Sequence, residues 1–367
     1  MKRILSLATF LLIISTLPAL AAHPDTKSEI ESLKERIRSL ESRLGEEQEP
    51  AEEAPFTLSA LGKHLSIGGL LELEASLEKT EGETENSDLT LATAQLSLET
   101  EINENLGGHV ILLYEEDPDN PDDETLKVDE AVISLACPNR LAGMTPTLQA
   151  GKLYLPFGNF NSHLISDPLT LELGETSDTA AIFGLEGETT NLSLGVFNGA
   201  VDTDNDSIDT VVVSATFQPE ETFGFGLSWI SDLAESDNGL VADKTLYGSA
   251  VPAAAAYLSA VFGQFDFEAE ILGALDNFDR PLVGLSELTG NRPLAWNLEA
   301  AWMPNDRTQL AVRAEGARDF QDDVRRYGIA GSYGIFPHAV LALEYLYADP
   351  DAEAKSHSLT GQLAFEF

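Results

Sequence analysis

The chain ends in SLTGQLAFEF, residues 358–367. Large apolar side chains lie on one alternating set of positions, Leu359, Leu363, Phe365 and Phe367, with Gly361 between them. Because successive side chains of a β-strand point to opposite faces, this stretch predicts a strand with one apolar face. The stretch also closes on an aromatic residue, which makes it the most specific fold signal in the sequence.

The same alternation recurs upstream, from about residue 64 onward. It is clearest over residues 71–78, 265–271, 296–302 and 341–347. Strict alternation over about ten residues, repeated along a chain, is the sequence form of a transmembrane β-barrel. The last strand also resembles the terminal strand that the barrel assembly machinery of bacterial outer membranes recognises. We therefore expect that machinery to be a partner, through the strand ending at Phe367.

The connections between these strands alternate in length. Short turns fall at residues 103–105, 218–220, 263–264, 304–306 and 336–338. Longer, mostly acidic connections fall at residues 78–88, 115–125, 198–208, 231–252 and 276–293. Short turns on the periplasmic side and long loops outside are typical of outer-membrane barrels. The sequence thus predicts an all-β transmembrane fold, an antiparallel barrel of about 16 strands over residues 64–367. A soluble β-solenoid or β-sandwich is the alternative.

Composition excludes several classes of protein. The chain has 367 residues, 21 basic and 62 acidic, and a formal net charge of −41. Phosphate binding needs clustered Lys and Arg, so nucleic acid is not an expected partner. A single cysteine rules out an internal disulfide and a cysteine-rich zinc site. No internal stretch is long and apolar enough to cross a bilayer as a helix.

The first residues have the pattern of a secretory signal. Lys2 and Arg3 precede an apolar run over residues 4–17, followed by small residues up to Ala22. This order predicts a signal peptide over residues 1–21 and hence export. Together with the barrel pattern, it predicts an outer-membrane protein with the following segment in the periplasm. A membrane anchor is the alternative, although it needs about 20 apolar residues.

A short amphipathic helix is expected next. The apolar residues of this stretch are spaced three and four apart, as in a coiled-coil seam. They are Ile30, Leu33, Ile37, Leu40 and Leu44. We predict a periplasmic coiled-coil helix over residues 22–45, with homo-oligomer contacts through residues 28–44, then an acidic linker over residues 46–63. The alternative is a helix that packs on its own chain.

If the apolar face of each strand meets lipid, the polar face lines the interior. The candidate lumen charges are Glu72, Glu74, Glu99, Lys152, Glu268, Glu270, Glu299, Arg313, Glu315 and Glu344. A pore lined with carboxylates concentrates cations and repels anions. Alternatively, these charges solvate a water-filled interior without choosing a solute.

Residues 151–176 depart from the acidic pattern of the other long connections. Phe157, Phe160, Leu164 and Ile165 are too apolar for a freely exposed loop, since exposed apolar clusters usually have a partner. A loop folded inward as a pore constriction is one interpretation, and a loop packed on the barrel rim is the other. The candidate constriction residues are Phe157, Gly158, Asn159, Phe160, Asp167, Glu172 and Glu175.

The same stretch, PFGNF at residues 156–160 followed by DPLT at 167–170 and LGET at 173–176, resembles the LbtU-family siderophore porins. The order of signal peptide, short coiled coil and barrel also fits that family. The resemblance implies passage of ferric siderophore across the outer membrane without the plug of a TonB-dependent receptor. About 300 barrel residues leave no room for such a plug inside a 22-stranded barrel. The resemblance assigns no ligand residues.

Other patterns are weaker. Asp202, Asp204 and Asp206 have calcium-loop spacing but lack the glycine and the final glutamate of such loops, so a solvated acidic loop is the main alternative. The sequence contains no G-x-S-x-G element, and we expect neither an enzyme nor a cofactor. The expected surroundings are outer-membrane lipid and lipopolysaccharide. Two other functions stay open: a general cation-preferring porin, and a structural barrel with a closed lumen whose coiled coil tethers the envelope.

Overall fold

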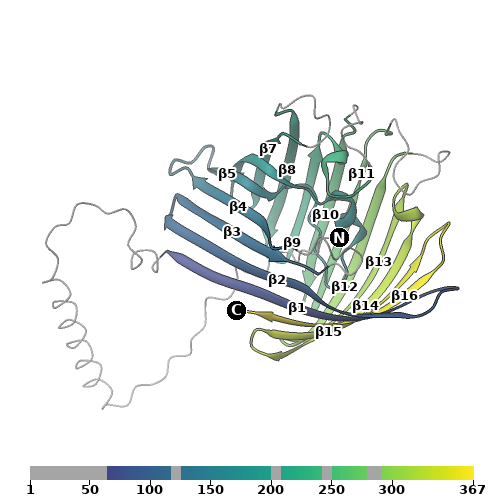
Figure 1. The fold of residues 1–367 in the computed structure, drawn as a ribbon. Helices are drawn as coiled ribbons and strands as arrows, with labels where there is room; N and C mark the ends of the chain where they lie inside the picture. The colour runs from purple at the N-terminus through teal and green to yellow at the C-terminus, as the bar shows by residue number, and fades with distance from the viewer. Residues whose placement is uncertain (1–63, 117–124, 200–207, 242–249, 279–290) are drawn as a thin grey trace, which may run out of the picture. The chain divides into compact units, whose positions relative to one another are not determined.

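The computed structural model describes residues 64–116, 125–199, 208–241, 250–278 and 291–367. Within them, sixteen antiparallel strands follow one another round a closed barrel, and the last strand pairs with the first (Figure 1). The predicted barrel is therefore confirmed, and the solenoid or sandwich alternative is wrong. The predicted signal peptide, coiled coil and linker lie outside the described residues, as do Asp202, Asp204 and Asp206.

The strands are β1 (Leu65–Thr80), β2 (Asn86–Asn103), β3 (Leu106–Tyr114), β4 (Lys127–Ala136), β5 (Thr145–Tyr154), β6 (Ser177–Glu186), β7 (Thr190–Phe197), β8 (Thr210–Glu220), β9 (Phe223–Ile230), β10 (Ala253–Phe262), β11 (Phe265–Ala274), β12 (Leu294–Asn305), β13 (Thr308–Arg318), β14 (Arg325–Phe336), β15 (Ala339–Asp349) and β16 (Ser356–Glu366). The helical pieces are α3 (Leu169–Gly174), η3 (Leu233–Glu235) and η5 (Gln321–Asp323). Among the described residues, no helix is long and apolar enough to cross a bilayer.

The C-terminal strand closes the barrel against β1. Leu73 lies opposite Leu363, and Leu71 opposite Phe365. The backbone N–H of Gly69 donates to the carbonyl of Phe367 at 2.9 Å, and that of Phe367 donates back at 3.1 Å. A Cβ on Gly69 would lie 2.5 Å from the ring of Phe367, so glycine makes room for the terminal phenylalanine.

Alternating residues face outward and inward, as the pattern predicts. On β1, Leu71 and Leu73 are 43% and 44% exposed, whereas Glu72 and Glu74 are 3% and 4% exposed. The same holds elsewhere: Leu298 on β12 is exposed beside the buried Glu299. The barrel thus carries a belt of apolar side chains outside and a set of carboxylates inside. Soluble proteins rarely expose contiguous apolar surface of this extent, which is what lipid would cover.

The two ends of the barrel differ. Tight turns at 104–105, 221–222, 263–264, 306–307 and 337–338 lie at one end, with the start of β1 and the end of β16; we call it the short-turn end. The connections at 155–176, 198–209, 231–252 and 275–293 lie at the long-loop end. Two predicted boundaries are wrong: β8 runs through Gln218 to Glu220, and β1 and β2 extend into the predicted 78–88 connection. In both cases strand pairing continues past residues with turn propensity.

Candidate functional site

The connection between β5 and β6, residues 155–176, folds into the barrel; we call it the inserted segment. The two ends of the segment lie side by side where β5 ends and β6 begins, because the N–H of Leu155 donates to the carbonyl of Thr176 at 2.9 Å. Its helix α3 contacts β11, β12 and β13. In the closed ring of sixteen strands, β13 is eight strands from β5 in either direction, so the segment reaches the opposite wall.

Glu270 on β11 holds the first turn of the segment. Its carboxylate accepts the backbone N–H groups of Asn159 at 2.7 Å and Phe160 at 3.1 Å, and the hydroxyl of Thr170 at 2.9 Å. Loop amides removed from water need a partner, and a carboxylate can accept several strong hydrogen bonds. Glu270 therefore serves as an anchor for the segment.

Two more inward carboxylates hold the tip. Glu299 on β12 accepts the N–H of His163 at 2.7 Å. Glu344 on β15 accepts the N–H groups of Ile165 at 2.5 Å and Ser166 at 3.0 Å. The tip is therefore fixed to strands β12 and β15, far from β5 in the strand order.

Two arginines pair with carboxylates on this wall. Arg313 on β13 is fully buried, 3.6 Å from Glu299 and 3.5 Å from Glu315, and it donates to the carbonyl of Ser166 at 2.8 Å. Arg326 on β14 lies 2.6 Å from Glu172 of α3 and 4.0 Å from Glu315. Buried charges are tolerated when they are paired. Here each arginine is paired with carboxylates, although Arg313 Nε and Glu315 Oε1 face each other at 3.5 Å without a hydrogen bond. A further N–H, that of Leu169, donates to Glu315 at 2.7 Å.

Apolar packing completes the attachment. Phe157, Leu169 and Leu173 are buried against residues of the β7–β12 wall, among them Phe197 and Leu272. Leu164, at the tip, packs against three alanines whose small side chains make space for it. These are Ala301, Ala311 and Ala330. The segment thus fills the interior next to β7–β15 instead of lying on the rim.

The candidate constriction residues take different places. Phe157 is only 1% exposed and belongs to the core, so it does not face a water path. Gly158 has a φ of +82°, and a Cβ there would lie 2.2 Å from the ring of Phe160, so only glycine fits. Glu175 is buried, and its carbonyl accepts the N–H of Asp237 at 2.8 Å. Asp167 is half-buried between the tip and α3, and Glu172 is in α3 itself, beside Arg326.

The remaining predicted lumen charges divide between two places. Glu268 is on β11, where it accepts the amide of Asn161. Glu72 and Glu74 on β1 and Glu99 on β2 lie away from the wall that holds the segment. Lys152 on β5 pairs with Ala131 and Thr179, on the outward face that carries Ile133 and Phe183, so its prediction as a lumen charge is wrong. The ammonium of Lys152 donates to the carbonyl of Val128 at 2.7 Å. Sequence reasoning missed Arg326, although the outward Tyr327 next to it gives its inward direction by alternation.

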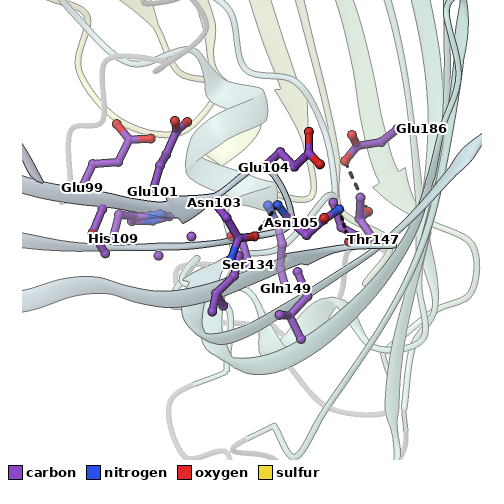
Figure 2. A pocket seen from close by; sticks show the side chains of 16 residues that line it. Glu99, Glu101, Asn103, Glu104, Asn105, His109, Ser134, Thr147, Gln149 and Glu186 are labelled. Carbon is purple, nitrogen blue, oxygen red and sulfur yellow. Dashed lines mark hydrogen bonds between the residues drawn. The ribbon is translucent and has the colours of Figure 1, made fainter. Parts of the chain in front are cut away.

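A polar hollow of about 290 Å³ lies on β2–β6 at the short-turn end. Figure 2 shows Glu99, Glu101 and Glu104 along β2 and its turn, and Glu186 hydrogen-bonded to Thr147. His109 lies in the same hollow, 2.6 Å from Glu130. Of this set, only Glu99 was predicted. Alternation could also have found Glu101, two residues along the same face of β2, whereas Glu104 lies in a turn, where alternation carries no information.

Comparisons with known proteins give distant relatives. No family model matches the chain. It is similar to a UPF0422 protein of Coxiella burnetii, 29% identical over 256 residues, which is 64% of this chain and 52% of that protein. A UPF0422 protein of Legionella pneumophila strain Paris is 24% identical over 140 residues, 37% of this chain and 26% of that protein. The matches span about half or less of the length of these curated relatives.

Solved porins share the fold. An anion-selective porin from Comamonas acidovorans has a TM-score of 0.59 at 11% identity, over 83% of this chain and 99% of that one. Salmonella typhi OmpF has a TM-score of 0.59 at 11% identity, over 83% of this chain and 97% of that one. Pseudomonas putida OprB has a TM-score of 0.59 at 8% identity, over 84% of this chain and 96% of that one. None of these comparisons tests the resemblance to LbtU-family siderophore porins, which stays a prediction. The chain therefore has the sixteen-strand antiparallel barrel fold of porins.

Proposed function

We propose that the protein is a channel of the bacterial outer membrane, in which the inserted segment narrows the lumen. The exposed apolar belt supports a place in lipid, and the unequal ends support the short-turn end facing the periplasm. The observation that carries the proposal is the attachment of residues 155–176 to strands on the far side of the barrel. A loop that crosses a barrel occupies part of its cross-section, so solutes pass beside it.

The route beside the segment is acidic. On the β7–β15 wall, Glu270, Glu299 and Glu344 are occupied by backbone amides of the segment. Glu72, Glu74 and Glu99 lie on β1 and β2 instead, and further carboxylates surround the short-turn mouth. Carboxylates along a water-filled path attract cations and repel anions. We therefore expect a cation-preferring channel.

Ferric siderophore is the cargo that the resemblance to LbtU-family porins implies. The stretch that carries this resemblance is the inserted segment itself, which links the family pattern to the part of the chain that narrows the lumen. A general cation-preferring porin without a siderophore role is the second candidate, and the acidic lining favours it equally.

The experiment is a planar-bilayer recording of the purified, folded protein under a KCl gradient. A reversal potential of the sign set by K⁺ supports the channel, and block of the current by added ferric siderophore would separate the siderophore channel from the general porin. The absence of channel steps from folded protein would contradict the proposal and favour the closed, tethering barrel.

A further inference from the structure

A histidine and two carboxylates meet where the tip of the inserted segment touches β11. His163 belongs to the tip. Asp266 and Glu268 are inward residues near the short-turn end of β11, and they alternate with the outward Phe265 and Phe267. One ligand atom from each of the three lies within 4.8 Å of the others. Among the described residues, this is the one cluster of three such groups with that geometry.

The spacing suits a metal ion. Metal bonds to imidazole nitrogen and carboxylate oxygen are about 2.0–2.2 Å, so two ligand atoms of one ion lie at most about 4.4 Å apart. His163 Nε2 and Asp266 Oδ2 are 3.7 Å apart, inside this limit and too far for a hydrogen bond. A shift of a few tenths of an ångström by the Glu268 carboxylate completes the set.

Two atoms of the cluster lack partners. His163 Nε2 and Asp266 Oδ1 are buried, and neither has a hydrogen bond. Buried polar atoms in folded proteins are nearly always bonded, so two buried polar atoms without partners call for an explanation. A cation between the two side chains supplies one, because neutral imidazole and carboxylate both donate electron pairs to metals.

The residues around the cluster fix its members in place. Glu299 accepts the backbone N–H of His163 at 2.7 Å. Ser259 donates its hydroxyl to Glu268 at 2.7 Å, and the amide of Asn161 donates to the same carboxylate at 3.3 Å. Hydrogen bonds of this kind orient the ligands of metal sites and raise their affinity.

We propose that His163, Asp266 and Glu268 bind one first-row divalent metal ion, represented by Zn²⁺, and so tie the tip of the inserted segment to β11. The imidazole distinguishes this site from the many carboxylates of the chain, because imidazole suits Zn²⁺ while Mg²⁺ and Ca²⁺ prefer oxygen ligands. Binding at this site does not depend on whether the barrel conducts, so the proposal stands apart from the channel function.

The test is calorimetric titration of Zn²⁺ into the full chain folded in detergent, with millimolar Mg²⁺ present to occupy exposed carboxylates. We expect one site in the wild type that Mg²⁺ does not abolish. His163→Gln and Asp266→Asn should each weaken Zn²⁺ binding by at least about tenfold, the loss typical even of residues that only orient ligands. His109→Gln is the matched control: it removes another half-buried histidine beside a carboxylate and should leave the affinity unchanged.

Equal Zn²⁺ affinity in the wild type and in both variants would overturn the proposal, as would loss of all Zn²⁺ binding in Mg²⁺. Folding of each variant is checked by its heat-modifiable migration on gels. If one variant fails to fold, the other still decides, together with Co²⁺ titration of the wild type. Visible absorption of bound Co²⁺ that vanishes in the folded variant supports the site, and absorption unchanged by the substitution contradicts it.

Discussion

Glutamates point into the barrel from two walls, and they have different surroundings. On β11–β15, Glu270, Glu299 and Glu344 accept backbone N–H groups of the inserted segment. On β1, the side chain of Glu74 accepts the amide of Gln362 on the neighbouring strand β16 at 3.0 Å. The same residue type at the same kind of strand position anchors the inserted segment on one wall and bonds a neighbouring strand on the other.

This difference teaches that an inward charge is not by itself a pore charge. An anchor contributes to stability, and its loss should loosen the segment. A lining carboxylate contributes to the potential of the water path, and its loss should change ion selectivity while leaving the fold intact. The following substitutions separate the two roles.

Replacing Arg313 with Met should have the largest effect. It would leave Glu299 and Glu315 buried without their shared cation, and removal of one partner from a buried ion pair costs about 3–5 kcal/mol. Thermal unfolding followed by circular dichroism measures the loss. Lys152→Met is the control on β5, where the ammonium bonds one carbonyl near the surface, and it should change stability by less than about 1 kcal/mol. Equal losses in the two variants would contradict the contrast between the walls.

Replacing Glu344 with Ala should come next. The N–H groups of Ile165 and Ser166 would lose their acceptor, and a hydrogen bond to a charged group contributes about 1.5–3 kcal/mol. We expect lower thermal stability and larger fluctuations of the open-channel current. Glu99→Ala on the exposed part of β2 is the matched control, for which neither change is expected. If Glu344→Ala changed neither the thermal stability nor the fluctuations of the open-channel current, the tip would need no anchor at Glu344.

The double substitution Glu72→Gln with Glu74→Gln should have the smallest effect on stability and a clear effect on selectivity. It removes two negative charges from β1 while keeping side-chain size and one acceptor oxygen on each side chain. The reversal potential under a KCl gradient should move toward zero, because fewer carboxylates attract K⁺. An unchanged reversal potential would place the ion path away from β1.

The fold could be predicted from the sequence because alternation is a local property. Leu71 to Leu77 and Leu359 to Phe367 each have an apolar face that the alternation identifies, and sixteen strands of this kind form the closed barrel. The ends of strands were less accurate: pairing with a neighbour carried β8 through Gln218 to Glu220, past a proline that suggested a turn.

The site was predicted only in outline. The apolar character of Phe157 and Leu164 indicated a segment that needs a partner, and the structure provides one inside the barrel. Which glutamates accept its amides could not be predicted, since Glu270 and Asn159 are 111 residues apart in sequence. The pairing of Arg326 with Glu172 across 154 residues depends on the same long-range closure.

The central claim is that the inserted segment narrows the lumen, and single-channel conductance after its removal tests this most directly. Because Leu155 and Thr176 are joined by a backbone hydrogen bond, a short Gly-Ser bridge can replace residues 157–174 without parting β5 and β6. Shortening the β15–β16 connection at residues 351–354 is the control for loop removal outside the barrel interior. We predict a larger conductance for the first variant alone. An unchanged conductance in a folded barrel without the segment would contradict the account.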